Sequence, residues 1–495
     1  MTTQVLYNKV RLWDVDHPPK GSGASIRNIE KIDAGAIPMI LRMASRGLQI
    51  DPTHFENVSV LLKQDMDKLT EDVKKLTGHY VNIDSGDQVA DLLFKKLKIK
   101  QIRPKMTTSG DRESVEDEVL KAIQHEHPVV PLIQLYKQYS KLDGTYASVI
   151  PKLAIKTAEG KRRIRFNVGS TRIPSGRLNS REPNLLAMPN RSKRARQMME
   201  GFITDPGWCF LSVDESQIEP RLAAHLSGDS NLCRIYDNDE DIYSDYATAA
   251  FKLKDERWEC QGFGSAGVHE GSLCKNQEHL GHGWHYPTVD KKEHRFPAKT
   301  CILAWIYDVS AKGLLEQMPI VCGSCLKPAT EHDCNNFYSH WNEDNCQDLI
   351  NAANVTYPGV LRDRFKNHAI ARKYGYIWDM WGRILHVTAK FSALPWIVSA
   401  GLREVCNFPY QSGAQGTIKL TMAAVDDDMQ YLKWYQHQLC HPLLQIHDEL
   451  LFEVREDMAE EIGEHVKWRF ETCCKLRVPI KAGALTAPVW GLMAK

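Results

Sequence analysis

Two features are missing from this sequence of 495 residues: a long apolar segment, and the apolar core of a secretion signal near the N-terminus. A helix that crosses a bilayer needs about 18 or more consecutive apolar residues, so we expect no membrane partner. Without a secretion signal we expect a cytoplasmic protein, in the host cytoplasm if the chain is viral. Thiols stay reduced there, so the 13 cysteines are candidates for metal binding before disulfide formation.

A net charge is also missing, since 63 basic and 62 acidic residues leave only +1. The basic residues are unevenly spread, however, because thirteen Lys and Arg but only two Glu lie between Lys152 and Arg196. That segment is either a solvated basic loop or a surface for a polyphosphate backbone, whose counterions it would displace. The composition, 43% apolar and 25% charged, is typical of globular proteins, and the length predicts two to four domains.

Helical periodicity dominates the early part of the chain. Apolar residues recur every three or four positions between Phe55 and Leu76, which predicts a long helix with one apolar face. Ser85 is a candidate N-cap for the next helix. Towards the C-terminus, residues 415–439 have a helical pattern, whereas 443–454 and 476–485 are typical of short strands. This alternation predicts an α/β (mixed α+β) fold with a central antiparallel sheet.

Two further segments place charged residues at the ends of predicted elements. An apolar run ends in Asp214 and precedes a helix whose Pro220 must lie in the first turn. Such an acid is either a catalytic group at a strand end or an ordinary helix cap. Arg295 and Lys299 share one helix face near a helix start that Pro297 fixes. They form either an anion site or a solvated basic edge.

The segment QIHDELLFEV, residues 445–454, places a histidine and two acids between apolar runs. Alone, it is either a hairpin with solvent-facing acids or part of a metal site. Together with VDESQIEPRLAAHLSGD and RFPAKTCILAWIYDVS, which precede it in the chain, it resembles the polymerase domain of family A DNA polymerases. The resemblance runs from about Pro38 to Lys495 and includes IPSGRLNSREPNL, LREVCNFPYQSGAQGTIK and the closing VPIKAGALTAPVWGLMAK.

This resemblance implies a right-hand polymerase, with an antiparallel palm sheet, helical fingers and a helical thumb. It divides the chain into an N-terminal extension (1–30), thumb (31–160), palm (161–235 and 376–495) and fingers (236–375) with insertions at about 258–287 and 320–346. The implied function is template-directed addition of deoxynucleotides to a primer 3′ end, with primer–template DNA and dNTPs as partners. A single-subunit RNA polymerase-like enzyme and a catalytically weak DNA-binding homologue are the alternatives.

The resemblance also implies the catalytic metal site. Asp214 and Asp448, with the backbone carbonyl of Glu215, would bind two Mg²⁺ ions, with Mn²⁺ as a substitute, because magnesium prefers hard oxygen ligands. Glu449 would lie beside the site without bridging both ions. Lys299 would complete the catalytic set.

The resemblance assigns one further group of residues to nucleotide binding and another to DNA binding. The implied nucleotide-binding group is Arg295, Lys299, Leu303, Tyr307, Gln217, Glu219 and Tyr243. Within it, Arg295 and Lys299 match triphosphate ligands, and Glu219 would exclude a ribose 2′-hydroxyl. The implied DNA-binding group is Arg177, Arg403, Asn407, Gln411 and His447. Donors in the minor groove can check base-pair geometry without reading sequence, and His447 would face the primer end.

The chain departs from the family pattern at several positions. Leu303 replaces an aromatic residue, Asp308 a glycine and Tyr243 a histidine. Leu186 and Ala187 remove two amide side chains from the usual PNLQNIP. The metal-binding acids are intact, so we still expect activity, with the rate and the handling of sugar-modified nucleotides left open.

The two insertions are rich in cysteine and histidine. Cys322 and Cys325 have the spacing of a zinc knuckle, and loops poor in apolar residues gain stability from a metal. We predict one structural Zn²⁺ there, with free thiols in surface loops as the alternative. The candidate ligands are Cys322, Cys325, His332, Cys334, Cys260 and Cys274.

Only about 30 residues precede the predicted thumb, which leaves no room for the 3′–5′ exonuclease domain of proofreading relatives. We therefore expect an enzyme without intrinsic proofreading, with a separate exonuclease or processivity factor as a candidate partner. We also expect a monomer. A bacteriophage-like origin fits so compact and divergent a chain.

Overall fold

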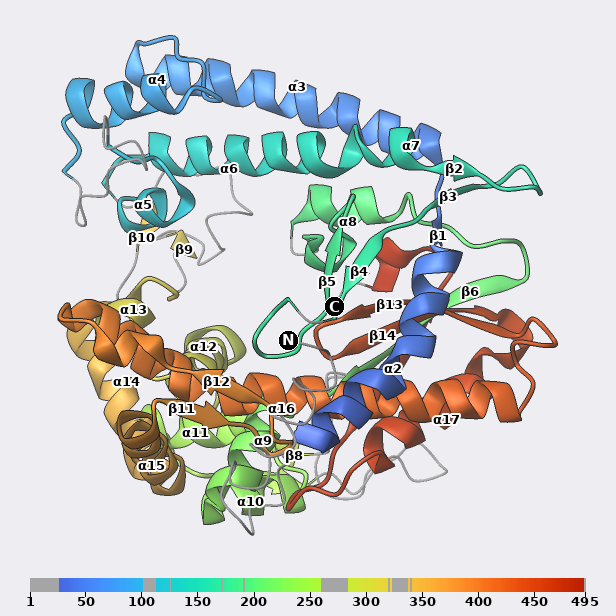
Figure 1. The fold of residues 1–495 in the computed structure, drawn as a ribbon. Coiled ribbons are helices and arrows are strands. Elements are labelled where there is room, and N and C mark those ends of the chain that lie inside the picture. Colours follow the sequence, from blue (N-terminus) through green and yellow to red (C-terminus); the bar gives the residue numbers. More distant parts are fainter. Residues whose placement is uncertain are drawn as a thin grey trace, which may run out of the picture.

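The computed structural model describes residues 26–100, 113–124, 126–170, 172–189, 192–259, 284–318, 321–322, 337–338 and 341–493. Helical units surround a central antiparallel sheet (Figure 1). A pair of long helices lies at the top of the view, and a second helical unit lies at the lower left. Among the helices that the structure describes, none combines the length and apolarity of a membrane span.

The central sheet has the strand order β13–β14–β6–β15, and every neighbouring pair is antiparallel, as predicted. Its strands are β6 (Trp208–Glu215), β13 (Cys440–Ile446), β14 (Glu449–Arg455) and β15 (Ala482–Ala487). The strand predicted from residue 476 was wrong in its start, because β15 begins at Ala482, opposite the last residue of β6. The preceding apolar side chains, Leu476, Val478 and Ile480, are buried in a different core, that of the second helical unit.

Three helices flank this sheet. α17 (Ala459–Thr472) packs on β6 and β15, and α2 (Ile26–Arg46) packs on β13 and on α16 (Pro395–Tyr431). The helix predicted over 415–439 is the C-terminal part of α16, which starts earlier than predicted and already buries Val405 and Phe408. It ends earlier, at Tyr431.

The long helices are α3 (Pro52–Thr77) and α6 (Val129–Leu142), which lie side by side (Figure 1). Asp51 caps α3 by accepting from the N–H of Thr53 over 2.9 Å. The predicted apolar face is buried at Phe55, Val58, Leu62, Leu69 and Val73. Met66 is half-buried, and Leu76 in the last turn is 39% exposed. Ser85 caps α4 (Gly86–Ala90), as predicted. The remaining helices of this region are α5 (Asp117–Ala122) and α7 (Ile150–Leu153).

The second helical unit has its own apolar core. It contains α9 (Ile218–Ser227), α10 (Ser230–Asp237), α11 (Ile242–Ala250), α12 (Phe296–Ile306), α13 (Ala311–Leu315), α14 (Glu343–Thr356) and α15 (Pro358–Tyr374). Pro220 lies in the first turn of α9 and Pro297 in that of α12, as predicted. The domain boundaries proposed from sequence stay a prediction. Within the range 31–160 proposed as the thumb, α2 packs on the sheet and on α16, at a distance from the tips of α3 and α6.

Candidate active site

The register of the central sheet brings together two acids that are far apart in the sequence. Asp214 is the penultimate residue of β6, and its Cα pairs with that of Glu449 at the start of β14. Asp448 occupies the two-residue turn between β13 and β14, next to His447, whose φ is +56°. The backbone N–H of Glu215 donates to the carbonyl oxygen of Asp448 over 3.1 Å. Asp214 and Asp448 therefore lie at the same end of the sheet.

Asp448 has the electrostatics of a shared acidic site. Desolvation at this position, followed by the negative charge of Asp214, raises the pKa of its carboxyl to about 7. The charges of Glu219 and Glu449 act in the same direction. Acids that disfavour each other's ionised form are stabilised by a divalent cation, and their hard oxygens suit Mg²⁺. The residues present thus fit the predicted metal site.

Glu449 is attached to the neighbouring strand. The hydroxyl of Ser212, two residues before Asp214, donates to Oε1 of Glu449 over 2.6 Å. This bond holds the Glu449 carboxylate against β6. It suits a supporting position beside the two aspartates.

Glu215 has a property that sequence reasoning missed. Its side chain is 2% exposed, and neither carboxyl oxygen has a hydrogen-bond partner among the described residues. Burial, with smaller contributions from Cys473 and Asp448, raises the pKa of this carboxyl well above its usual range, which favours its neutral form. Strand alternation is the signal that could have revealed this, because adjacent residues on β6 face opposite sides of the sheet.

Glu219, in the first turn of α9, is contacted by two predicted residues from other segments. The Tyr307 hydroxyl donates to Oε2 of Glu219, and Nη2 of Arg177 donates to Oε1 over 3.0 Å. Burial and the charge of Glu219 raise the pKa of Tyr307, so the phenol keeps its proton. Arg177, Glu219 and Tyr307 therefore form one contact set.

Tyr243 lies close to both cations of the α12 segment. The guanidinium carbon of Arg295 is 5.3 Å, and Nζ of Lys299 is 5.5 Å, from the centroid of the Tyr243 ring. Arg295 also donates through Nε and Nη2 to the carboxylate of Asp241, over 2.8 and 3.0 Å. Asp241 is 1% exposed and caps α11 through the N–H of Ser244. Arg295 of the predicted anion site is therefore paired with a carboxylate of the protein itself.

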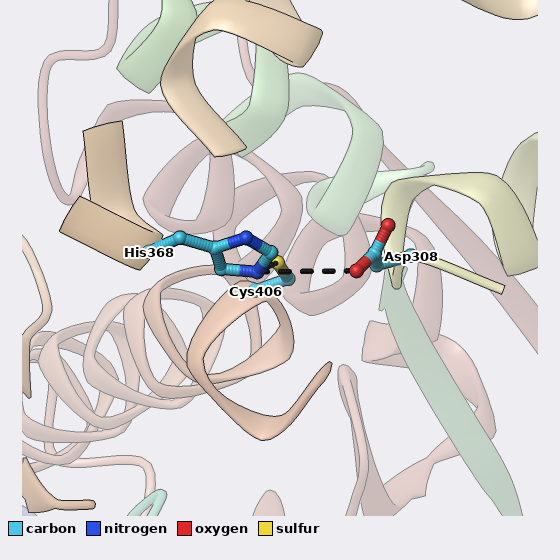
Figure 2. Close-up of side chains that lie close together, drawn as sticks. All are labelled: Asp308, His368 and Cys406. Atoms are coloured by element: carbon cyan, nitrogen blue, oxygen red, sulfur yellow. Dashed lines mark hydrogen bonds and ion pairs between the residues drawn. The ribbon is translucent and has the colours of Figure 1, made fainter. Parts of the chain in front are cut away.

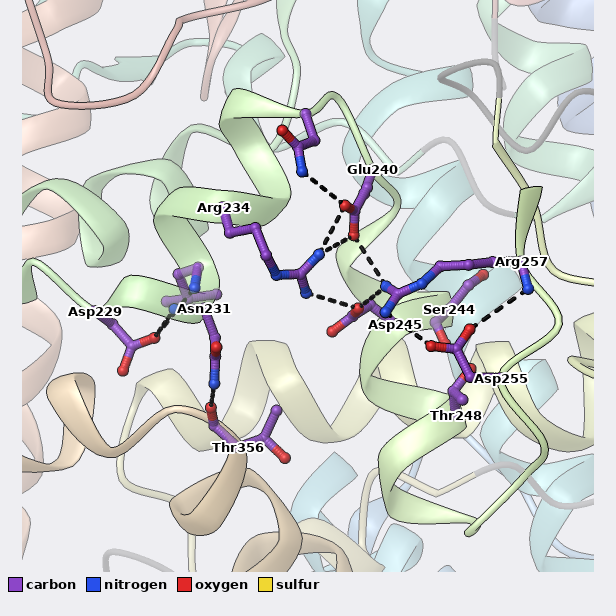
Figure 3. A network of polar contacts seen from close by, with 12 residues as sticks. Asp229, Asn231, Arg234, Glu240, Ser244, Asp245, Thr248, Asp255, Arg257 and Thr356 are labelled. Atoms are coloured by element: carbon purple, nitrogen blue, oxygen red, sulfur yellow. Dashed lines mark hydrogen bonds and ion pairs between the residues drawn. The ribbon is translucent and has the colours of Figure 1, made fainter. Parts of the chain in front are cut away.

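The segment that carries Asp241 is fixed by a network of ion pairs (Figure 3). Glu240, 4% exposed, accepts from Nη1 of Arg234 over 2.7 Å and from Nη1 of Arg257 over 3.0 Å. Both arginines also pair with Asp245 on α11. Charge-assisted hydrogen bonds in a shared network fix the positions of their side chains, because several bonds must break before one side chain can move. The position of Asp241 is thus set by the protein itself.

Four polar residues recur at every fourth position along α16. They are Arg403, Asn407, Gln411 and Gln415. With its amide nitrogen as donor, Asn407 bonds the carbonyl oxygen of Tyr307 over 3.2 Å. Gln415, which sequence reasoning missed, is 2% exposed, and its Nε2 has no partner among the described residues. The position of Gln415, four residues after Gln411, is the sequence signal that could have identified it.

Three other predicted residues lie around this site. Desolvation and the positive charge of Arg177 lower the pKa of His447, which favours its neutral form. Oε1 of Gln217 accepts from the hydroxyl of Tyr236 over 3.1 Å. Leu303 packs against the core of the second helical unit.

A cavity of about 490 Å³ opens beside Asp214. Its lining residues are Asp214, Ser216, Asp239, Lys467, Glu471, Lys481, Ala482 and Gly483. The cavity leaves room for part of a ligand next to the acid of β6.

Five of the predicted zinc ligands lie outside the described residues. They are Cys260, Cys274, Cys325, His332 and Cys334. Of Cys322 only the backbone is described, in β9 (Val321–Cys322), which pairs with β10 (Phe337–Tyr338). The zinc site therefore stays a prediction. Leu186 and Ala187 lie in a short 3₁₀ helix, Leu185–Ala187.

Comparison with known proteins gives one consistent result. A family model described as DNA polymerase family A matches residues 52–261 and 284–492. The thermostable DNA polymerase I of Thermus filiformis is 29% identical over 443 residues, which are 90% of this chain and 46% of that protein. DNA polymerase I of Chloroflexus aurantiacus is 26% identical over 468 residues, 94% of this chain and 43% of that protein. The chain thus spans about half the length of these curated relatives.

A solved structure is also similar. It is the POL domain of Pol1 from M. smegmatis in complex with DNA primer-template and dNTP. The TM-score is 0.73 at 22% sequence identity, over 93% of this chain and 70% of that one. At this identity the likeness shows the fold.

Proposed function

Because this chain belongs to DNA polymerase family A, we propose that it is a DNA-directed DNA polymerase that adds deoxynucleotides to a primer 3′ end. The observation that carries the proposal is the pairing of β6 with β14, which sets Asp214 near Asp448. Primer–template DNA and dNTPs, with which the M. smegmatis domain was solved, would be the substrates here as well. The reaction would take place in the cytoplasm.

Asp214, Asp448 and the backbone carbonyl of Glu215 would hold two Mg²⁺ ions. When bound, the ions supply charge neutralisation at the attacking 3′ oxygen and the leaving pyrophosphate. The protein's own contribution is to fix Asp448 in a tight turn against β6 before substrate arrives. Preorganised charge of this kind avoids the cost of rearrangement during the reaction.

The α12 segment would bind the incoming nucleotide. Arg295 and Lys299 would contact the triphosphate, with Tyr243 near both cations. Glu219, held by Tyr307 and Arg177, would occupy the space near the sugar and exclude a 2′-hydroxyl. These contacts support a preference for deoxynucleotides.

The DNA would lie along α16 and the β13–β14 turn. Arg403, Asn407 and Gln411 recur on one face of α16, and His447 projects from the turn next to Asp448. The basic segment between Lys152 and Arg196 would add contacts to the phosphate backbone. Binding should therefore weaken as the salt concentration rises.

Primer extension with Mg²⁺ tests the proposal. Asp448→Ala should reduce extension by about 100-fold or more, because it removes a metal-binding carboxylate. Asp457→Ala is the matched control, since Asp457 is exposed at the far end of β14 and pairs with Arg455. Equal synthesis by Asp448→Ala and the unmodified chain would overturn the assignment, and absence of synthesis by the unmodified chain would favour the DNA-binding alternative.

The RNA polymerase-like alternative is distinguished by the sugar. On one primed template the chain should extend with dNTPs and hardly at all with rNTPs. Glu219→Ala should raise rNTP incorporation relative to dNTP incorporation by roughly 10-fold or more, because it opens space at the 2′ position. A chain that already prefers rNTPs would support the alternative. Lack of proofreading by these 495 residues stays an expectation, tested by the survival of a mismatched primer.

A further inference from the structure

Asp308, His368 and Cys406 converge beside the end of α12, separate from the acidic site (Figure 2). Asp308 lies in the turn after α12, with φ of +59°, while His368 lies in α15 and Cys406 in α16. One candidate ligand atom of each lies within 4.8 Å of the others. Thiolate, imidazole and carboxylate are the ligands that Zn²⁺ and related transition metals prefer.

The two distances from Nε2 of His368 are close to those of a tetrahedral site. Nε2 of His368 is 3.1 Å from Sγ of Cys406 and 3.9 Å from Oδ2 of Asp308. Zn–S bonds of about 2.3 Å and Zn–N or Zn–O bonds of about 2.0 Å give N···S and N···O separations of about 3.5 and 3.3 Å. Shifts of roughly half an ångström would therefore bring Nε2 of His368 to both separations. A water or the carbonyl oxygen of Leu402, 3.1 Å from Nε2, could supply the fourth ligand.

An outer residue already orients the carboxylate. Nη1 of Arg364 pairs with Oδ1 of Asp308 over 3.1 Å, whereas Oδ2 is the oxygen nearest His368. Nη2 of the same guanidinium donates to the carbonyl oxygen of Trp305 over 2.5 Å, which fixes the arginine in turn. Metal-ligating carboxylates are commonly held by such outer hydrogen bonds. With Cys406 ionised, the negative charges of Cys406 and Asp308 and the positive charge of Arg364 sum to one negative charge, which favours a bound cation.

The alternative is a closed cluster in which hydrogen bonds alone satisfy the three side chains. In that case Cys406, 2% exposed, keeps its proton, and burial raises the pKa of its thiol to about 12. A metal ion would replace this proton, which leaves to solvent. Access is available from the Asp308 side chain, which is 29% exposed.

We propose that Asp308, His368 and Cys406 bind one transition-metal ion, with Zn²⁺ as the expected metal, and that the ion fixes the turn that ends α12. Asp308 directly follows Tyr307, whose hydroxyl donates to Glu219. The ion would join α12, α15 and α16 at a single point. The proposal does not rest on the polymerase activity, since binding is measured without DNA or nucleotide.

Co²⁺ is a suitable probe, because its thiolate bonds produce a charge-transfer absorption that hydrogen-bonded clusters lack. The experiment uses, as the parent chain, the full sequence in which the five candidate zinc-binding cysteines of the insertions are changed to serine: Cys260, Cys274, Cys322, Cys325 and Cys334. These changes remove the other candidate thiolate site. After chelation and buffer exchange, Co²⁺ titration should produce the band and saturate at one ion per chain. Cys406→Ser and His368→Gln should each abolish it. Cys346→Ser, at another buried cysteine of the second helical unit, is the matched control and should retain it.

Zn²⁺ should displace the Co²⁺ band and should raise the midpoint of thermal unfolding of the same parent chain, but not of its Cys406→Ser variant. Two results would overturn the proposal: no charge-transfer band in the parent chain, or a band that persists after Cys406→Ser. The spectrum of the parent chain is decisive even if a variant folds poorly.

Discussion

At the scale of single residues, Asp448 links the stability of the chain to its acidic site. It lies in a tight turn beside β6, and the neighbouring charge of Asp214 disfavours its ionised form. A site that concentrates negative charge in this way costs stability until a cation is bound. Removal of the acid should therefore stabilise the metal-free protein while it removes activity.

Asp448→Asn should become more stable than the unmodified chain as the pH rises in the absence of metal. The pKa of Asp448 is about 7 in the folded chain, against about 3.9 when unfolded, so the folded chain holds the proton more tightly. Its stabilising contribution is complete below about pH 4 and is lost as the pH rises through 7, by at most about 1.4 kcal/mol per pH unit. Urea denaturation in EDTA between about pH 5 and pH 8 measures the difference.

Asp457→Asn provides the comparison, because that exposed acid should leave the pH dependence unchanged. Saturating Mg²⁺ should stabilise the unmodified chain more at pH 8 than at pH 5, since the metal needs ionised ligands. Parallel stability curves for Asp448→Asn and the unmodified chain would contradict a raised pKa at this residue.

At the scale of elements, the start of α11 positions a cation of the neighbouring α12 segment. Asp241 caps α11 and also holds the guanidinium of Arg295 through two hydrogen bonds. The ion-pair network around Glu240 keeps this cap in place (Figure 3). One buried carboxylate thus joins the stability of a helix to the orientation of a predicted triphosphate ligand.

Asp241→Asn should raise the KM for dNTP by about 10-fold with a smaller change in kcat. Asparagine is also a good N-cap, so α11 should survive, while Arg295 loses its charged partner and its fixed orientation. Steady-state primer extension at varied dNTP concentration measures both constants. Asp255→Asn, at an exposed partner of Arg257, should leave KM unchanged. A lower KM for Asp241→Asn would show instead that Asp241 competes with the triphosphate.

The elements around the site differ in how far sequence could predict them. β6 and the β13–β14 hairpin were predictable, because short continuous apolar runs lie directly next to acids. The start of β15 was not, since Leu476, Val478 and Ile480 have a strand-like pattern but are buried in the core of the second helical unit. Such a choice depends on tertiary contacts that a local pattern does not contain.

The residues of the site also differ in how far the sequence could predict them. The acids Asp214 and Asp448 are identifiable by motif, whereas the burial of the Glu215 carboxyl without hydrogen-bond partners among the described residues and the carboxylate partner of Arg295 are not. Both properties arise from residues distant in sequence or on the far face of the sheet. Asp308 was noticeable only as a departure from the family pattern, and its neighbours His368 and Cys406 were found only in space.

At the scale of the whole molecule, separate apolar cores divide the described residues. One core joins the sheet to α2, α16 and the base of α3, and a second lies within the helices around α12. A third lies at the distal ends of α3 and α6, from Val73 to Ile133. The acids of β6 and the β13–β14 turn belong to the first unit and Tyr307 to the second, so the candidate site lies where two cores meet.

The distal core should therefore loosen independently of the sheet. Ile133→Ala removes a fully buried side chain from that core and should cost about 2–5 kcal/mol of local stability. The distal core shares no buried residue with the sheet core. Amide hydrogen exchange should therefore quicken in the described residues between Val81 and Ile133 but stay unchanged in β6, β13 and β14. Val60→Ala, at a position on α3 that is 53% exposed, should change neither region. Faster exchange in the sheet by the same factor would show that the cores unfold as one unit, and the site would then depend on packing at the far tip of the molecule.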